Sequence, residues 1–264
     1  MKKKFSVLLA CLVMIFSCND EDFNQIPTVE SSGIAIPTIY SKTHISTSVG
    51  ESHNLHLGDM YEYLSTQNNL DSSNIHQYAH TFFGSMDNGE LASEDYDFVK
   101  NNGSYSSLLS SDFNAEISRL NQMLEASDFS DINEFKNYMY NYTPIHITDK
   151  NELIAWEYYA DTFFHSFEYW SNNIDNWNTL IVSNNSAGNP VAASNSYPIC
   201  GVYSSWWKRT WCNVGVFAGV DAASAGVKAL VALISGSPIV FGTIVASAVG
   251  ASASSVIASI VSNL

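Results

Sequence analysis

The last 36 residues of this 264-residue chain carry no charged side chain, and this feature restricts the possible folds more than any other. From Asn213 onwards the composition is dominated by Ala, Val, Ile, Gly and Ser. The run 235–238, Ser-Gly-Ser-Pro, joins a helix-ending Gly to a Pro that suits a first helical turn, which predicts two helices connected by a tight turn. Each predicted arm, about 213–234 and about 239–262, has more than 20 residues and would be about 30 Å long, enough to cross a bilayer core.

Small side chains recur at every fourth position of these arms and leave one helical face almost bare. The predicted helix-packing positions are Gly215, Gly219, Gly226, Gly242, Ala246, Gly250, Ser254 and Ala258. Such a face lets a second helix approach closely. The same stripe is expected for a hairpin in lipid and for a hairpin buried in a water-soluble fold. In composition the segment resembles the glycine-zipper helices of bacteriocin-like and pore-forming segments, which implies membrane insertion or self-association.

A short stretch rich in tryptophan and basic residues directly precedes the predicted hairpin. Its members are Trp206, Trp207, Lys208, Arg209 and Trp211. Indole rings and long basic side chains favour the headgroup level of a membrane, so this stretch predicts an interfacial belt. The alternative is that the tryptophans cover the core of a water-soluble domain.

The pattern from Glu51 to Val182 is helical, with apolar residues at i, i+3, i+4 and i+7. Ser111, Asp131 and Asp149 are predicted helix starts. Strand signals are sparse. The sequence therefore predicts an all-α fold, made of an acidic, aromatic-rich domain of four to six helices and the C-terminal Gly/Ala-rich hairpin.

Charge divides the chain into segments. Residues 19–200 hold 25 acidic and 5 basic side chains, whereas 201–264 hold one acidic and three basic ones. The predicted organisation is a leader at 1–17, a tether at 18–50, the helical domain at 51–182, an Asn/Ser/Pro-rich linker at 183–200 and the belt with its hairpin at 201–264. Without the leader, 8 basic side chains face 26 acidic ones, a net charge of −18 that disfavours nucleic-acid binding.

The first 18 residues have the three parts of an export signal. Three lysines at 2–4 are followed by an apolar run from Phe5 to Phe16 and by a small residue, Ser17. Met14 to Cys18 resembles the lipobox of bacterial lipoproteins, with Ile15 and Ser17 in the positions before the cysteine. The resemblance implies that Cys18 is lipidated and becomes the new amino terminus, with several acyl chains as a stable anchor.

An acidic cluster, Asn-Asp-Glu-Asp at 19–22, follows the lipidation position. It resembles the surface-export tether of Bacteroidota lipoproteins. The resemblance implies a lipid-anchored protein of the cell envelope, on the outer membrane and displayed at the cell surface. The alternative is an ordinary secretory leader with Cys18 unmodified.

Two further cysteines, Cys200 and Cys212, would lie in a compartment where disulfides persist. We expect them to form a disulfide, which closes a loop of about 13 residues and stabilises by roughly 3 kcal/mol. Two free thiols are the alternative.

Candidate chemistry is sparse. His76 and His80 share a helical face at i, i+4, but the glutamate of an HExxH motif is missing, so we expect no metal site and no cofactor. Nucleophile-elbow and phosphate-loop motifs are also missing from the sequence, and we expect no enzyme. The predicted function is that of a cell-envelope lipoprotein of unknown specific activity that is membrane-active or self-associating through its hairpin. The alternative is a water-soluble interaction module, for an unidentified protein partner, with the hairpin as its core.

Overall fold

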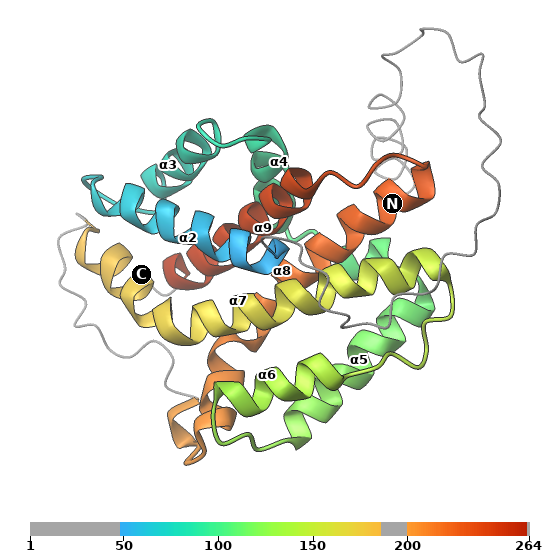
Figure 1. Cartoon of the computed structure of the whole chain (residues 1–264). Helices are drawn as coiled ribbons and strands as arrows, with labels where there is room; N and C mark the ends of the chain where they lie inside the picture. Colours follow the sequence, from blue (N-terminus) through green and yellow to red (C-terminus); the bar gives the residue numbers. More distant parts are fainter. Residues whose placement is uncertain (1–47, 186–199, 263–264) are drawn as a thin grey trace, which may run out of the picture. The chain divides into compact units, whose positions relative to one another are not determined.

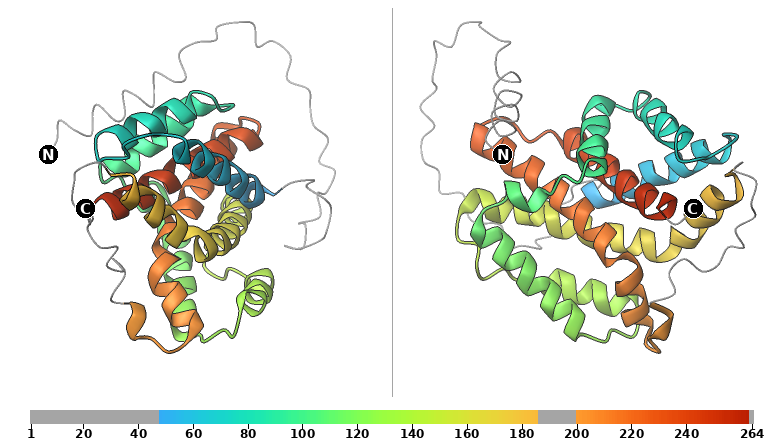
Figure 2. Two further views of the ribbon diagram at one scale, coloured as in Figure 1. Left: turned by 90° about the vertical axis from the view of Figure 1, so that its left-hand side faces the viewer. Right: turned by 180° about the vertical axis from the view of Figure 1, so that it is seen from behind.

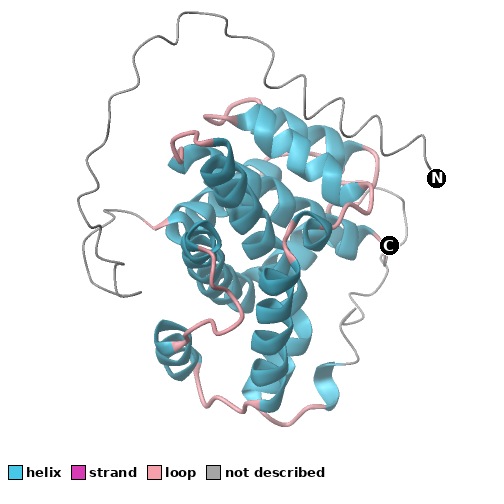
Figure 3. Ribbon diagram, turned by 90° about the vertical axis from the view of Figure 1, so that its right-hand side faces the viewer, coloured by secondary structure: helices cyan, strands magenta, loops and turns pink. Residues whose placement is uncertain are grey.

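The computed structural model describes residues 48–185 and 200–262, which form α-helices and two short 3-10 helices with no β-strand among them (Figure 3). The prediction of an all-α fold is confirmed. The elements are α2 (Val49–Ser65), α3 (Asn74–Phe83), α4 (Gly89–Lys100), η1 (Tyr105–Leu108), α5 (Ser111–Ala126), α6 (Ile132–Asn141), α7 (Lys150–Ser183), η2 (Cys200–Val202), α8 (Trp206–Ser235) and α9 (Phe241–Val261).

Side-chain caps determine where several of these helices begin. Asp131 and Asp149 each accept two backbone N–H groups at the starts of α6 and α7, as their spacing predicts. The cap of α5 is Ser110 rather than Ser111, because the hydroxyl of Ser110 accepts the hydrogen bond from the third helical residue. The predicted start was therefore wrong by one residue.

The two longest helices form the centre of the structure. Helix α7 has 34 residues and α8 has 30, so they are about 51 and 45 Å long. They pack against each other, and Figure 1 shows α2 and α9 on one side of α7 and α5 and α6 on the other. The view from behind shows the same order (Figure 2). Large aromatic side chains of α7, including Trp156, Phe167 and Trp170, fill the space between these helices.

Helix α9 lies inside the structure. Fourteen of its 21 residues are buried, and it contacts α2, α4 and α8. Its Ala, Gly and Ser side chains are short on every face, so other helices can approach it from several directions. The Gly/Ala-rich helices and the helices of 49–183 consequently share one hydrophobic core. Most of the predicted linker, 186–199, lies outside the described residues.

Candidate functional site

A pocket of about 220 Å³ lies where the start of α2 meets α6 and the first half of α7. It is lined by Ser48, Val49, Met139, Tyr140, Ile154, Trp156, Glu157, Tyr158, Ala160, Asp161 and Phe164. Four of these residues are aromatic and two are acidic, and none is basic. Because the pocket combines an apolar wall with a few polar groups, it has the general character of a small-ligand site.

Helical spacing brings the functional side chains of α7 to one face. Ile154, Glu157, Asp161 and Phe164 follow each other at intervals of three or four residues, so their side chains form a stripe along the helix. Two carboxylates one turn apart repel each other. A nearby positive charge would relieve this repulsion.

Asp161 is held in place by α2. One of its oxygens, Oδ2, accepts a hydrogen bond of 2.9 Å from the backbone N–H of Gly50. The other, Oδ1, lies 3.5 Å from Nε2 of His165. Burial raises the pKa of Asp161, although His165 and the Gly50 N–H oppose this rise. A Cβ at Gly50 would lie 2.7 Å from the backbone oxygen of Asp161, so the close approach of α2 to α7 requires glycine here.

Glu157 is in a different situation. Its side chain is exposed to solvent at the pocket mouth and makes no hydrogen bond or ion pair within 48–185 and 200–262, and the partial burial of its carboxylate raises its pKa. The pocket therefore contains one carboxylate that is positioned by the backbone and another that has no compensating partner among the described residues.

A polar path leads from this pocket into the core. Nδ2 of Asn54 donates to the backbone oxygen of His165 at 2.8 Å, and Oδ1 of Asn54 lies 3.0 Å from Nδ1 of His53. On the far side of the His53 ring, Nε2 lies 3.5 Å from Oδ2 of Asp221. The path thus joins α7 to α2 and α2 to α8.

Asp221 is the centre of a buried hydrogen-bond network. Its Oδ2 accepts hydrogen bonds from the hydroxyls of Ser166 and Ser252 and from Nε1 of Trp170, and the Trp170 bond is 3.2 Å long. Burial raises the pKa of Asp221 to about 7, and these three donors oppose the rise. Burial also lowers the pKa of His53 to about 4, so the two residues are not an ion pair at neutral pH.

The protonation of this pair follows from its geometry. When Nδ1 of His53 carries the proton and donates to Asn54, Nε2 is a hydrogen-bond acceptor that faces the carboxyl group of Asp221. At 3.5 Å this nitrogen makes no hydrogen bond within the described residues, and a protonated carboxyl group removes the repulsion between its lone pair and a carboxylate. Because His53, Asp221, Ser166, Trp170 and Ser252 are all fully buried, the network joins four helices and offers no surface to a ligand.

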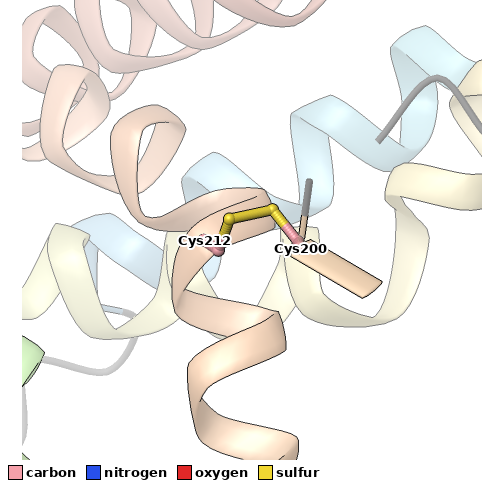
Figure 4. Close-up of a disulfide and its surroundings, with 2 residues drawn as sticks. All are labelled: Cys200 and Cys212. Carbon is pink, nitrogen blue, oxygen red and sulfur yellow. A yellow bond between two sulfur atoms is a disulfide. The ribbon is translucent and has the colours of Figure 1, made fainter. Parts of the chain in front are cut away.

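Two roles were predicted for cysteine residues, lipidation and a disulfide. Cys18, the lipidation position, lies outside the described residues. Cys200 and Cys212 form a disulfide with an S–S distance of 2.03 Å, which connects η2 to the second turn of α8 (Figure 4).

The tryptophan-rich stretch does not form a separate belt but belongs to the first turns of α8. Trp207 is fully buried, and its Nε1 donates to the backbone oxygen of Leu124 at 2.8 Å. The Trp207 ring contacts Phe129 and Phe135. Trp206, Lys208 and Trp211 are partly buried and Arg209 is exposed. The interfacial interpretation therefore does not hold for Trp207, because the aromatic residues of α5 to α7 surround it.

The small-residue stripe contains positions of two kinds. In α9, Ala246, Gly250 and Ser254 are buried, and a Cβ at Gly250 would lie 2.0 Å from the backbone oxygen of Ala92 in α4. Gly250 is therefore a true helix-packing glycine. A Cβ at Gly242 would meet the Asn88 side chain at 2.8 Å, whereas Ala258 is exposed.

In α8 the glycines of the stripe differ in how closely other residues approach them. A Cβ at Gly226 would make ordinary contacts at 3.5 Å with Phe113 and Tyr159, so this position packs as predicted. A Cβ at Gly219 would meet nothing within 4 Å, and at Gly215 it would meet Trp211 of the same helix. The helix-packing prediction is wrong for Gly219, which lines an open groove between α8, α5 and η1 together with the buried Gly215.

The two histidines of α3 contact α4. Nδ1 of His76 bonds to the hydroxyl of Tyr96, and Nε2 of His80 lies 3.2 Å from Oδ1 of Asp97. Within the described ranges, no group of three or more His, Cys, Asp or Glu side chains could hold a metal ion.

Sequence reasoning missed the centre at Asp221 and the pocket at Glu157 and Asp161. A signal existed for the first, because Asp221 is the single acidic residue after position 200 and stands in an apolar helix. For the pocket, the i, i+4 pair of carboxylates among aromatic residues was visible, but the contribution of α2 was not.

Helices α8 and α9 are long and apolar enough to cross a membrane by length and composition, although the apolar window of α9 is 78% buried. No protein-family model, curated protein or solved structure matches this chain.

Proposed function

We propose that this protein is a lipid-anchored binding module of the cell envelope, whose Gly/Ala-rich helices are the core of a water-soluble helical domain. The anchor is supported by the leader and by Cys18 in its lipobox-like setting, and the acidic run at 19–22 supports display at the outer surface. The role is one of binding and not of catalysis.

One observation carries the water-soluble interpretation. The apolar helix α8 contains a fully buried carboxyl group, that of Asp221, which receives hydrogen bonds from α7 and α9 and faces a histidine of α2. If α8 and α9 left the domain to enter a bilayer, Asp221 would lose the partners on α2 and α7. A carboxyl group without partners in hydrocarbon costs several kcal/mol.

The experiment uses the chain from position 18 onwards with Cys18→Ser, produced without the leader and purified without detergent. We expect one monodisperse species by light scattering, a cooperative thermal transition, and no flotation with liposomes. A protein that precipitates without detergent, or that floats with lipid, would contradict the proposal.

A membrane-active role is the second candidate, and a specific observation favours it. Val231, Ile234 and Val240, at the connection between α8 and α9, are exposed, Ile234 by 70%. An exposed apolar tip of this kind could enter a membrane surface. Release of a trapped dye from the same liposomes distinguishes this role from simple binding.

A further inference from the structure

We propose that the pocket between α2, α6 and α7 binds a small organic cation, an ammonium group carried on a short apolar chain. This inference concerns the ligand class of the pocket, and the water-soluble core proposed above does not depend on it.

The negative charge of the pocket is the first reason to expect a cation. Glu157 and Asp161 both line it, and among the described residues none of the lining side chains is basic. Asp161 contacts a neutral N–H group of Gly50 and the ring of His165 at 3.5 Å, whereas Glu157 makes no hydrogen bond or ion pair with any residue that the structure describes. A bound cation would reduce the repulsion between the two carboxylates, and an anion would increase it.

The aromatic wall is the second step, and it is independent of the carboxylates. Tyr140, Trp156, Tyr158 and Phe164 line the same cavity. Trp156 is buried and stacks on Tyr142 and Tyr159, so the rings that can face a ligand are those of the other three residues. The faces of aromatic rings attract ammonium groups, most strongly where water is excluded.

An ammonium group of the protein itself contacts two of these rings at the edge of the pocket. The ammonium nitrogen of Lys136 lies 5.6 Å from the ring centre of Tyr140 and 5.2 Å from that of Phe164. Lys136 is not one of the residues that line the cavity. Tyr140 and Phe164 thus hold one ammonium group at the edge of the pocket, while none of the described lining residues brings a cation into the cavity with its two carboxylates.

The third step is the size of the pocket, which limits the size of the ligand. At about 30 Å³ for each water-sized group, 220 Å³ holds about seven such groups. This is below the range of pockets that enclose drug-sized ligands. The expected ligand is therefore an alkylamine or an alkyltrimethylammonium ion with a chain of a few carbons.

The test is calorimetric titration of the chain from position 18 onwards with Cys18→Ser, using butylammonium and butyltrimethylammonium as probes. Sodium butyrate and 1-butanol have the same chain without the positive charge. We expect a dissociation constant of about 1 mM or tighter for at least one cation and no measurable binding of butyrate or butanol. Equal binding of butanol and the cations would overturn the proposal.

A matched pair of variants locates the site. Glu157→Gln removes the uncompensated carboxylate at nearly constant shape and should weaken cation binding at least about tenfold. Glu94→Gln removes the same charge from an exposed position on α4 and should leave binding unchanged. Circular dichroism and melting temperature verify that both variants fold. Equal affinities of the two variants would show that the cations bind elsewhere, and would contradict this inference while the water-soluble core still stands.

Discussion

Nε2 of His53 lies 3.5 Å from Oδ2 of Asp221, and neither side chain is exposed to solvent. This contact links α2, near the start of the described residues, to α8, in the Gly/Ala-rich part of the chain. Burial lowers the pKa of His53 to about 4 and raises the pKa of Asp221 to about 7. The carboxyl group therefore has a higher pKa than the imidazole. Both are therefore most stable in the folded protein as neutral groups.

The pair predicts a specific pH dependence of stability. The pKa of Asp221 is higher in the folded than in the unfolded state, so its contribution is complete below about pH 4 and is lost as the pH rises to about 7. The pKa of His53 is lower in the folded state, so its contribution is complete above about pH 6.5 and is lost as the pH falls to about 4. Between these limits the two slopes oppose each other.

Single substitutions should separate the two slopes. Relative to the parent protein, the free energy of unfolding of Asp221→Asn should rise with pH between 4 and 6.5, by up to about 1.4 kcal/mol per pH unit. That of His53→Gln should fall over the same interval. Urea denaturation at several pH values measures both. Parallel pH profiles for the two variants and the parent would contradict this account of the pair.

The two kinds of small-residue position should respond differently to the same substitution. Gly250→Ala places a methyl group 2.0 Å from the backbone oxygen of Ala92, and a backbone atom cannot rotate away. We expect a loss of about 1–3 kcal/mol or more. Gly219→Ala meets no atom within 4 Å and should stabilise by up to about 1 kcal/mol through helix propensity. Denaturation midpoints that shift in the same direction would show that one of these environments is described incorrectly.

The disulfide between Cys200 and Cys212 should stabilise the first turns of α8. Replacing both cysteines by serine should lower the free energy of unfolding by about 3 kcal/mol, since the bond closes a loop between residues 12 apart. A reducing agent should lower the melting temperature of the parent protein and leave the double variant unaffected. If both respond equally to the reducing agent, the two thiols are free in the folded protein.

Glu116 should be sensitive to a nearly isosteric change. Its carboxylate is fully buried and accepts hydrogen bonds from the hydroxyl of Tyr142, from Arg119 and from the backbone N–H groups of Ile145 and His146. Burial alone would raise the pKa of Glu116, but these donors lower it.

An amide group cannot replace this carboxylate. In Glu116→Gln, one oxygen is replaced by an NH₂ group that faces other donors, so we expect a loss of about 3–5 kcal/mol in urea denaturation. Gln122→Glu, on the exposed side of the same helix, serves as a control and should change stability by less than about 0.5 kcal/mol. A loss of less than 1 kcal/mol for Glu116→Gln would mean that the donors find other partners.

Helical periodicity and capping residues are local properties, and they predicted the fold class and the starts of α6 and α7 at Asp131 and Asp149. The surroundings of the small-residue stripe are not local. Gly219 and Gly250 have the same side chain in the same kind of helix, but one faces an open groove and the other touches the backbone of Ala92. A periodic pattern cannot distinguish these two cases.

The candidate pocket was not predictable for a related reason. The Glu157 and Asp161 pair is visible in the sequence, but the pocket exists only because Gly50 allows α2 to approach α7 closely. Similarly, Trp207 belongs to a stretch that is typical of a membrane interface, and the contacts that bury it come from Phe129 and Phe135, more than 70 positions earlier. Pairings at such separations leave no trace in a single sequence.

Hydrogen exchange along α9 tests the central claim most directly, namely that the Gly/Ala-rich helices are the core of a water-soluble domain. In detergent-free solution of the chain from position 18 onwards with Cys18→Ser, amides of 244–257 should exchange as slowly as those in the middle of α7, and liposomes should not change their rates. Fast exchange of α9 while α7 remains protected, or new protection of α9 only when liposomes are added, would contradict the claim.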